Sequence, residues 1–289
     1  MYSSISKNKR MTVVIFTMFI AIISGIGLFF ALASKNMSVF WWALIGSLIY
    51  AGVEYAFSSK IALAMTGAQE VTHSQAPQLY AAVETISITA GLPMPKVYII
   101  DDPAPNAFAA GTKPENSLVC VTTGLLDIMD KSELEAVIAH EIGHIKNYDV
   151  RLSMAAVALT ASIGFLADIA IRIVFRDDKD SKNAVMMIVG LIFAIISPIL
   201  AAIVRMAISR EREYLADATA VMLTRYPEGM IGALEKLRDY SRPMARQSST
   251  VSGLFISNTL EKGFFSNLFS THPPLEKRIM RLKQNAGRF

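Results

Sequence analysis

Cysteine and charge are both scarce in this chain of 289 residues. Its single cysteine, Cys120, cannot form an internal disulfide. It lies in the apolar run Leu118–Val121, where a buried strand residue is expected rather than a nucleophile. The absence of disulfides agrees with a reducing compartment. Only 18% of the residues are charged and 53% are hydrophobic, which is too apolar for an ordinary soluble domain.

The apolar residues are concentrated in four runs, each close to the ~20 residues that cross a bilayer as a helix. These runs are Met11–Ala33, Val39–Phe57, Leu152 to about Val174, and Ala184–Val204. The third run contains Asp168 and Arg172 one helical turn apart, and we expect them to neutralise each other as a pair. The sequence therefore predicts four transmembrane helices.

The first apolar run also invites interpretation as a signal peptide, because Ala31-Leu32-Ala33 imitates a cleavage site. Its apolar core is, however, longer than the roughly 7–15 residues usual in such peptides. A second apolar run also follows almost at once. We therefore favour an uncleaved membrane anchor.

Lysine and arginine are unevenly distributed around the ends of these runs. If both termini face the cytoplasm, that side carries the larger share: Lys7, Lys9, Arg10, Lys60, Lys146, Arg151, Arg205, Arg210 and Arg212. The opposite side carries Lys35, Arg176, Lys179 and Lys182. The distribution predicts a multi-pass protein of the inner or plasma membrane with both termini cytoplasmic. This topology explains most of the net charge of +4, so we expect no nucleic-acid partner.

One pentapeptide, His140-Glu141-Ile142-Gly143-His144, matches the pattern H-E-x-x-H. On a helix, residues four apart lie on one face, so His140 and His144 can direct their rings at one Zn²⁺ per chain. Glu141 then lies beside the metal, within reach of a water molecule that the metal activates. On this motif alone, a surface helix with two unrelated histidines remains the alternative.

The residues before this motif predict the start of its helix. Ser132 and Glu135 have the spacing of a capping box, and apolar residues at helical spacing follow. If the helix continues beyond His144 into the third apolar run, His144 lies about 10 Å from the membrane boundary. Asp149 falls in the polar collar between them, where it is either a salt-bridge partner or solvated, and we favour solvation.

The segment between the second run and the motif predicts a small antiparallel sheet preceded by a helix. The helix is expected at 75–90, and strands at Lys96–Asp101 and Ser117–Thr122. Between the strands, Asn106, Ala107 and Phe108 open a stretch with two interpretations. It is either an edge strand that pairs with an extended peptide substrate or a hairpin arm, and the sequence does not separate them.

A third metal ligand is expected after the fourth apolar run, because hydrolytic zinc sites usually have three protein ligands. Glu213 follows Val204 by roughly 13 Å along a continuing helix, a height similar to that of the histidines. Glu211 competes with it. Glu213 is favoured because Asp217 lies one turn further along the same face, where its carboxylate can hydrogen-bond a ligating histidine.

These residues together carry a family resemblance. The chain resembles the HtpX-type membrane zinc proteases, bacterial relatives of the CAAX prenyl endopeptidases. The resemblance covers nearly the whole chain. Besides the pentapeptide and the four-run layout, it rests on the Asn106-Ala107-Phe108 strand, Thr123-Gly124-Leu125-Leu126, Ser209-Arg210-Glu211-Arg212-Glu213-Tyr214-Leu215-Ala216-Asp217 and Thr271-His272-Pro273-Pro274-Leu275-Glu276-Lys277-Arg278-Ile279.

The resemblance implies a role for each matching residue. His140, His144 and Glu213 match the zinc ligands, and Glu141 matches the catalytic glutamate. Asp217 matches an acid behind the ligands, His272 a histidine that steadies the oxyanion, and Asn106–Phe108 the strand that pairs with substrate. From the residues alone, a histidine before two prolines is more often a cap or a packing residue.

The expected architecture is a mainly α membrane protein with a cytoplasmic zincin-like α+β protease domain. Residues 1–59 and 151–204 form the transmembrane helices, and 60–150 and 205–289 form the two parts of the protease domain. C-terminal helices are expected at Pro227–Tyr240 and Leu275–Leu282, with a loop or plain connector at Arg246–Asn258.

The implied activity is zinc-dependent cleavage of damaged or misfolded membrane proteins at cytoplasmic segments, as part of a stress response. The partners are then polypeptide substrates and the lipid bilayer. Two alternatives stay open: a prenyl-protein endopeptidase, and a non-proteolytic scaffold or transporter with a structural zinc site. The four runs visible here are fewer than the spans of the prenyl endopeptidases, which counts against the first alternative.

Overall fold

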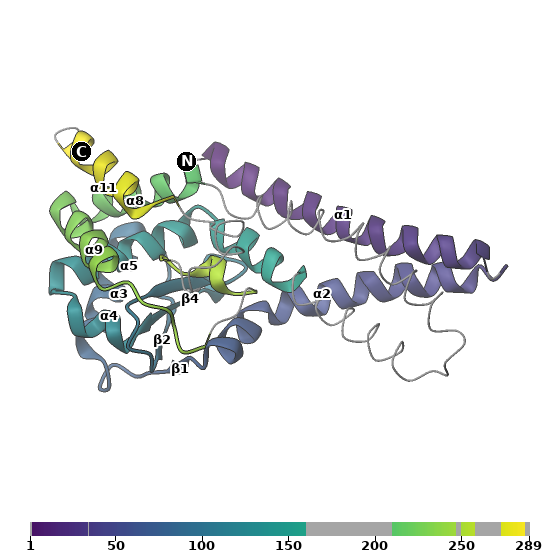
Figure 1. Ribbon diagram of the computed structural model, residues 1–289, viewed down its shortest axis with the longest axis horizontal. Helices are drawn as coiled ribbons and strands as arrows, with labels where there is room; N and C mark the ends of the chain where they lie inside the picture. Colours follow the sequence, from purple (N-terminus) through teal and green to yellow (C-terminus); the bar gives the residue numbers. More distant parts are fainter. Residues whose placement is uncertain (1, 34, 160–209, 247–249, 258–272, 287–289) are drawn as a thin grey trace. The chain divides into compact units, whose positions relative to one another are not determined.

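The computed structural model describes residues 2–33, 35–159, 210–246, 250–257 and 273–286 (Figure 1). The chain divides into two compact units. One comprises Met1–Lys9, Ser59–Met154 and Ile208–Phe289, and the other comprises Arg10–Ser58 and Ala155–Ala207. The fourth predicted span, most of the third, and the pair Asp168 and Arg172 lie outside the described residues.

The first two predicted spans are confirmed as long apolar helices, α1 at Tyr2–Ala33 and α2 at Ser38–Thr66. Each contains a stretch long and apolar enough to cross a membrane, Ile5–Leu32 in α1 and the whole of α2. Large apolar side chains stay exposed on both helices, which suits contact with lipid. Helix α2 extends past the predicted end at Phe57 and reaches Thr66.

A mixed four-stranded sheet forms in the unit that contains the pentapeptide His140–His144, called the HEIGH motif below, with strand order β1-β2-β4-β3. Its strands are β1 at Gln69–Glu70, β2 at Lys96–Ile100, β3 at Ala107–Ala110 and β4 at Leu118–Thr122. The predicted antiparallel sheet is wrong at one pairing, since β2 and β4 run parallel. The chain reverses before β3 and again before β4, and β4 lies between β2 and β3. Strand β3 is thereby left at the edge.

Helices pack around α5, which spans Lys131–Lys146 and carries the HEIGH motif. Helix α5 contacts α3 (Pro77–Ala90), α8 (Arg210–Thr224), α9 (Pro227–Asp239) and the edge strand β3. Helix α11 (Leu275–Asn285) packs in turn on α9 and α8. The described part of this unit also contains the short helices α4 (Thr123–Ile128), η1 (Pro114–Asn116) and η2 (Ser252–Leu254). Helix α5 is therefore the centre of the core.

The start of α5 lies earlier than the sequence analysis predicted. Asp130, not Ser132, is the N-cap: its carboxylate accepts a hydrogen bond from Glu133 N at 2.9 Å. The Glu133 carboxylate accepts in return from Asp130 N at 2.8 Å, which completes a capping box. Ser132 lies inside the first turn and donates to Asp130 Oδ1. The predicted box at Ser132 and Glu135 is therefore wrong.

The end of α5 also differs from the prediction. The helix stops at Lys146, and Asn147 and Tyr148 form a turn before residues 149–159 resume a helix. Tyr148 has a φ of 59°, a left-handed conformation that breaks the helical path. A straight continuation from His144 into the third apolar run is therefore excluded. The turn places Asp149 on the side of the histidines.

Candidate metal site

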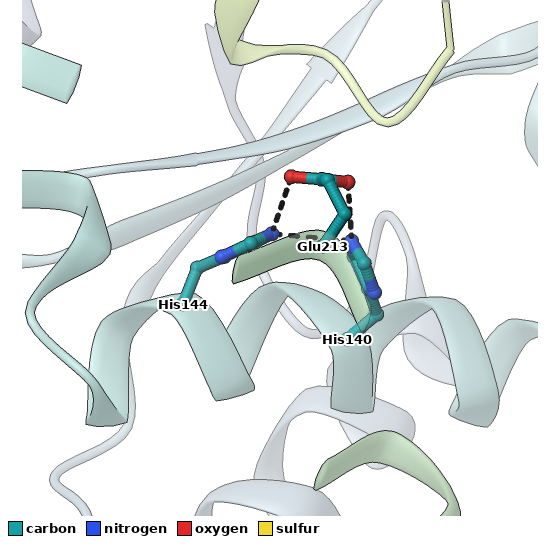
Figure 2. Close-up of side chains that lie close together, drawn as sticks. All are labelled: His140, His144 and Glu213. Carbon is teal, nitrogen blue, oxygen red and sulfur yellow. Dashed lines mark hydrogen bonds and ion pairs between the residues drawn. The ribbon is translucent and has the colours of Figure 1, made fainter. Parts of the chain in front are cut away.

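Three side chains from two helices converge at one point in the core (Figure 2). Helix α5 supplies His140 and His144, whose Nε2 atoms lie 3.2 Å apart. Helix α8 supplies Glu213, with Oε2 3.7 Å from His140 Nε2 and Oε1 3.5 Å from His144 Nε2. Ligand atoms around a tetrahedral Zn²⁺ are about 3.3 Å apart, given Zn–N distances near 2.0–2.1 Å. The three side chains therefore fit a single metal ion of this size.

The competing acid, Glu211, does not join this cluster. It lies on the exposed side of α8, whereas the Glu213 residue is only 5% exposed. Helices α8 and α5 pack closely where Gly143 faces Thr219 and Ala216. A Cβ at this glycine would make ordinary van der Waals contact, 3.4 Å from Thr219 Cβ and 3.7 Å from Ala216 Cα. This packing places Glu213 beside the histidines.

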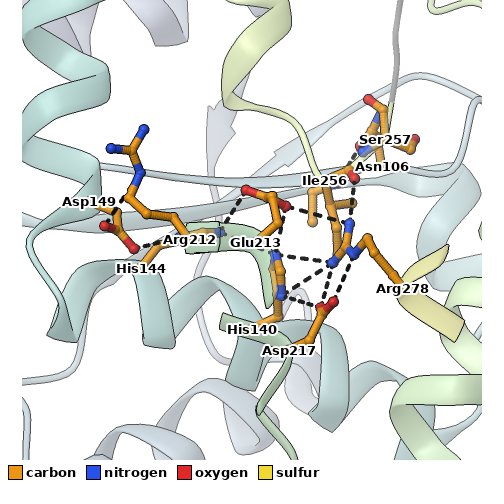
Figure 3. A network of polar contacts seen from close by, with 11 residues as sticks. Asn106, His140, His144, Asp149, Arg212, Glu213, Asp217, Ile256, Ser257 and Arg278 are labelled. Carbon is orange, nitrogen blue, oxygen red and sulfur yellow. Dashed lines mark hydrogen bonds and ion pairs between the residues drawn. The ribbon is translucent and has the colours of Figure 1, made fainter. Parts of the chain in front are cut away.

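Each histidine ring is held at its other nitrogen by a buried carboxylate (Figure 3). His140 Nδ1 lies 3.0 Å from Asp217 Oδ1, and His144 Nδ1 lies 3.0 Å from Asp149 Oδ2. Such pairs fix the tautomer and the orientation of a ligating ring, leaving Nε2 for the metal. The expectation that Asp149 is solvated is wrong: it is 3% exposed, because the turn after α5 folds it back.

The Asp217 carboxylate forms an ion pair with a buried arginine. Arg278 on α11 is completely buried and donates from Nη2 to Asp217 Oδ1 at 2.6 Å and from Nε to Asp217 Oδ2 at 2.9 Å. Its Nη1 also lies 3.5 Å from Glu213 Oε2. Burial alone would raise the pKa of Asp217, but the Arg278 charge and the His140 hydrogen bond hold this pKa below its usual value. Asp217 is therefore an anion.

The charged side chains around the two histidines give them different pKa values. Burial is the largest effect on His140 and lowers its pKa to about 4, so this ring is neutral. Burial acts in the same direction on His144, but the hydrogen bond to Asp149 and the charge of Glu213 outweigh it and raise its pKa to about 9. Asp149 and Glu213 thus favour a positive charge on the His144 ring.

Glu141 lies between the metal cluster and the sheet. It is 1% exposed, and burial is the main reason why its pKa is raised to about 7. The charge of Glu213 raises this pKa further, while His144, Arg278 and a hydrogen bond from the backbone N–H of Ala109 oppose the rise. A carboxylate with a pKa near neutrality can both accept and release a proton.

The predicted substrate strand is present, but its outer edge is already covered by the chain. Asn106, Ala107 and Phe108 are each at most 2% exposed. The N–H of Ile256 donates to Ala107 O at 2.9 Å, and Phe255 packs edge-on against Phe108 with ring centroids 5.0 Å apart. Residues 255–257 therefore occupy the position along β3 that an extended peptide would take.

Comparison with known proteins identifies this arrangement. Residues 73–286 match Peptidase family M48. The chain belongs to this family. Members of M48 are metal-dependent peptidases, so the protein is a metalloendopeptidase and the converging side chains lie in a metallopeptidase domain.

Individual relatives of this M48 peptidase match it along its whole length. A protease HtpX homolog of Tropheryma whipplei (strain Twist) is 47% identical, with all of both chains covered. One from Dictyoglomus turgidum is 44% identical and covers all of this chain and 96% of its own. Among solved structures, Ste24p of S. mikatae has a TM-score of 0.52 at 19% identity, covering 96% of this chain and 67% of its own. That likeness shows a shared fold.

Three residues behind the metal cluster of this M48 peptidase escaped the sequence analysis as functional candidates: Asn8, Asp149 and Arg278. Arg278 had a signal, because it interrupts the apolar face that Leu275, Ile279 and Leu282 form on α11. A charged residue on a core-facing stripe is expected to have a buried partner. Asn8 had no such signal. His272 lies outside the described residues, so its predicted role remains a prediction.

Proposed function

We propose that this M48 metalloendopeptidase uses one zinc ion per chain to cleave damaged or misfolded membrane proteins on the cytoplasmic side of the cell membrane. The observation that carries the proposal is the convergence of His140, His144 and Glu213 beside the buried Glu141. Two imidazoles and one carboxylate are a recurring ligand set of catalytic zinc sites. In the described part of the chain no fourth histidine, cysteine or acid joins the cluster, whereas structural zinc sites have four protein ligands.

The chain's own residues divide the chemistry between them. His140, His144 and Glu213 would hold the metal, which when bound supplies Lewis-acid polarisation of a peptide carbonyl and of water. Glu141 takes a proton from the attacking water and delivers it to the leaving amine. Asp217 and Asp149 keep the two imidazole rings in the orientation that ligation requires. His272, by resemblance, steadies the developing oxyanion.

The substrate is proposed to lie extended along β3, with backbone hydrogen bonds to the Asn106–Phe108 stretch. Because Ile256 and Phe255 cover this edge, a substrate must displace residues 255–257 before it can pair there. The backbone N–H of Ala109 in the same strand faces Glu141 and lowers its pKa, so the proton-transfer group lies beside the pairing edge. Unfolded segments of membrane proteins expose the free backbone that this mode of binding needs.

The decisive experiment compares three variants of the full-length protein in detergent, with casein and a membrane-protein reporter as substrates. Glu141→Gln should keep one zinc per chain and lose peptide hydrolysis by at least about two orders of magnitude. Glu213→Ala should lose zinc, while Glu211→Ala should keep it. Hydrolysis at the wild-type rate by Glu141→Gln would refute the assigned role.

Two further arms test the finer parts of the proposal. Cleavage sites inserted in cytoplasmic and in external loops of the reporter separate the two sides of the membrane. Only the cytoplasmic site should be cut. A prenylated peptide tests the rival activity: cleavage of this peptide, with no cleavage of the reporter, would replace the proposed function with a prenyl-protein endopeptidase.

A further inference from the structure

The first residues of helix α1 contact Asp149, the carboxylate that holds the ring of His144 (Figure 3 shows Asp149 and His144). Asn8 is 4% exposed, and its side-chain amide donates two hydrogen bonds. One goes to Asp149 Oδ1 at 2.6 Å and the other to the backbone carbonyl of Asn147 at 3.0 Å. A polar side chain buried this completely and matched to two acceptors occupies a defined position rather than a solvated one.

The two oxygens of the Asp149 carboxylate have different partners. Its Oδ2 lies 3.0 Å from His144 Nδ1, while Oδ1 receives the amide of Asn8. Among the described residues a charged group also faces Oδ1: Arg212 on α8, whose Nε lies 3.7 Å away, beyond hydrogen-bond length. Asn8 is thus the short contact that fixes the rotation of the carboxylate. Without it, Asp149 could turn and carry the ring of His144 away from the cluster.

The neighbouring residue on α1 braces the backbone of the same turn. Lys9 Nζ lies 4.3 Å from the centre of the Tyr148 ring. Tyr148 has the left-handed φ of 59° that places Asp149 beside His144. A left-handed conformation is unfavourable for a bulky residue and persists only where surrounding contacts support it. Asn8 and Lys9 together contact each of the three residues 147–149.

We propose that Asn8 is a positioning residue for the metal ligand His144, acting through Asp149. This inference rests on the proposed function in that it takes His144 as a ligand. Since α1 continues from Asn8 into an apolar stretch long enough to cross a membrane, one helix serves two purposes. It can anchor the chain, and it completes the support behind one metal ligand.

A double-mutant cycle on the full-length protein tests the proposal, with zinc retention against a chelator as the readout. Asn8→Leu removes the amide at similar volume and should weaken zinc binding about tenfold, the lower end of the range for residues that support a ligand. Asp149→Ala should weaken it by about 10–100-fold. Asn8→Leu should add nothing in the Asp149→Ala background, because it acts through that carboxylate. Ser6→Leu, at an exposed position two residues earlier, is the control and should bind zinc normally.

Cobalt substitution supplies a readout that a merely structural role would not move. The visible spectrum of Co²⁺ in the Asn8→Leu protein should differ from wild type, because the His144 ring is no longer fixed. Independent effects of the two substitutions would overturn the proposal, as would an unchanged spectrum with normal zinc retention. The His144→Ala protein keeps the two proposals separate: if it retains zinc at wild-type affinity, the metal site itself is wrong, whatever Asn8 does.

Discussion

Arg278 offers the sharpest test of the charge arrangement behind the metal cluster. Its side chain is fully buried and donates at 2.6 and 2.9 Å to the two oxygens of Asp217, which is 2% exposed. In Arg278→Met, the volume is largely kept, but Asp217 remains as a buried anion whose only remaining close partner among the described residues is His140. Removing one member of a buried ion pair typically costs about 3–5 kcal/mol of the free energy of unfolding.

The same reasoning predicts that a second substitution restores the stability of Arg278→Met and that Arg278→Lys loses only part of the stability. Combining Arg278→Met with Asp217→Asn removes both charges and should restore most of the free energy of unfolding. Zinc retention should not recover, because an amide orients the His140 ring less well than a carboxylate. Arg278→Lys should be intermediate, because a single ammonium group cannot bridge both Asp217 oxygens while also reaching Ile256 O, which Arg278 Nη1 contacts at 3.2 Å.

The assay is denaturant unfolding in detergent, followed in the metal-loaded and metal-free protein, with zinc per chain measured on the same samples. Lys277→Met is the matched control, because this residue precedes Arg278 on α11 and is exposed. Its free energy of unfolding should stay within about 0.5 kcal/mol of wild type. If Arg278→Met stays within the same margin and binds zinc normally, the buried ion pair has no such role.

Two other predictions follow from the fold. Asp130→Ala should lower the free energy of unfolding by about 1 kcal/mol, because it removes the N-cap of α5, whereas Ser132→Ala should change it much less. A thermal-unfolding comparison in detergent distinguishes the two caps, and an equal loss would contradict the capping assignment. Ile256→Pro removes the N–H that pairs with Ala107 O, a bond worth about 0.5–1.5 kcal/mol, and should raise kcat/KM for casein about two- to tenfold by freeing the β3 edge. A fall in kcat/KM at unchanged zinc content would show that residues 255–257 assist catalysis instead.

Local patterns predicted the elements that depend on neighbouring residues. The HEIGH helix, the two central strands and the start of α9 at Pro227 follow from short-range periodicity and turn residues, and the structure confirms them. Long apolar runs identified α1 and α2 for the same reason. The convergence of Glu213 with the histidines was predicted from helix rise, although the straight continuation assumed after His144 is excluded, and Glu213 was favoured over Glu211 because Asp217 lies one turn further along.

Other features could not be predicted from the sequence, for two reasons. Some depend on contacts between residues far apart in the chain, and others depend on a choice between neighbouring residues with the same spacing pattern. The cap of α5 was predicted at Ser132, which has a glutamate three residues later, but Asp130 has the same spacing to Glu133 and is the cap in the structure. The order of the strands could not be predicted from burial, because β3 and β4 are both fully buried, yet β4 lies inside the sheet and β3 at its edge. Asp149 looked solvated because nothing near it in the sequence reveals Asn8, 141 residues away.

The two carboxylates behind the histidines are held by residues made at very different moments of translation. Asn8, which grips Asp149, has already been synthesised when the HEIGH helix forms. Arg278, which grips Asp217, is added 138 residues after His140. A nascent chain that already contains the HEIGH motif and Glu213 therefore still lacks the arginine that fixes the His140 side. The support behind His140 is therefore complete only once α11 has been made.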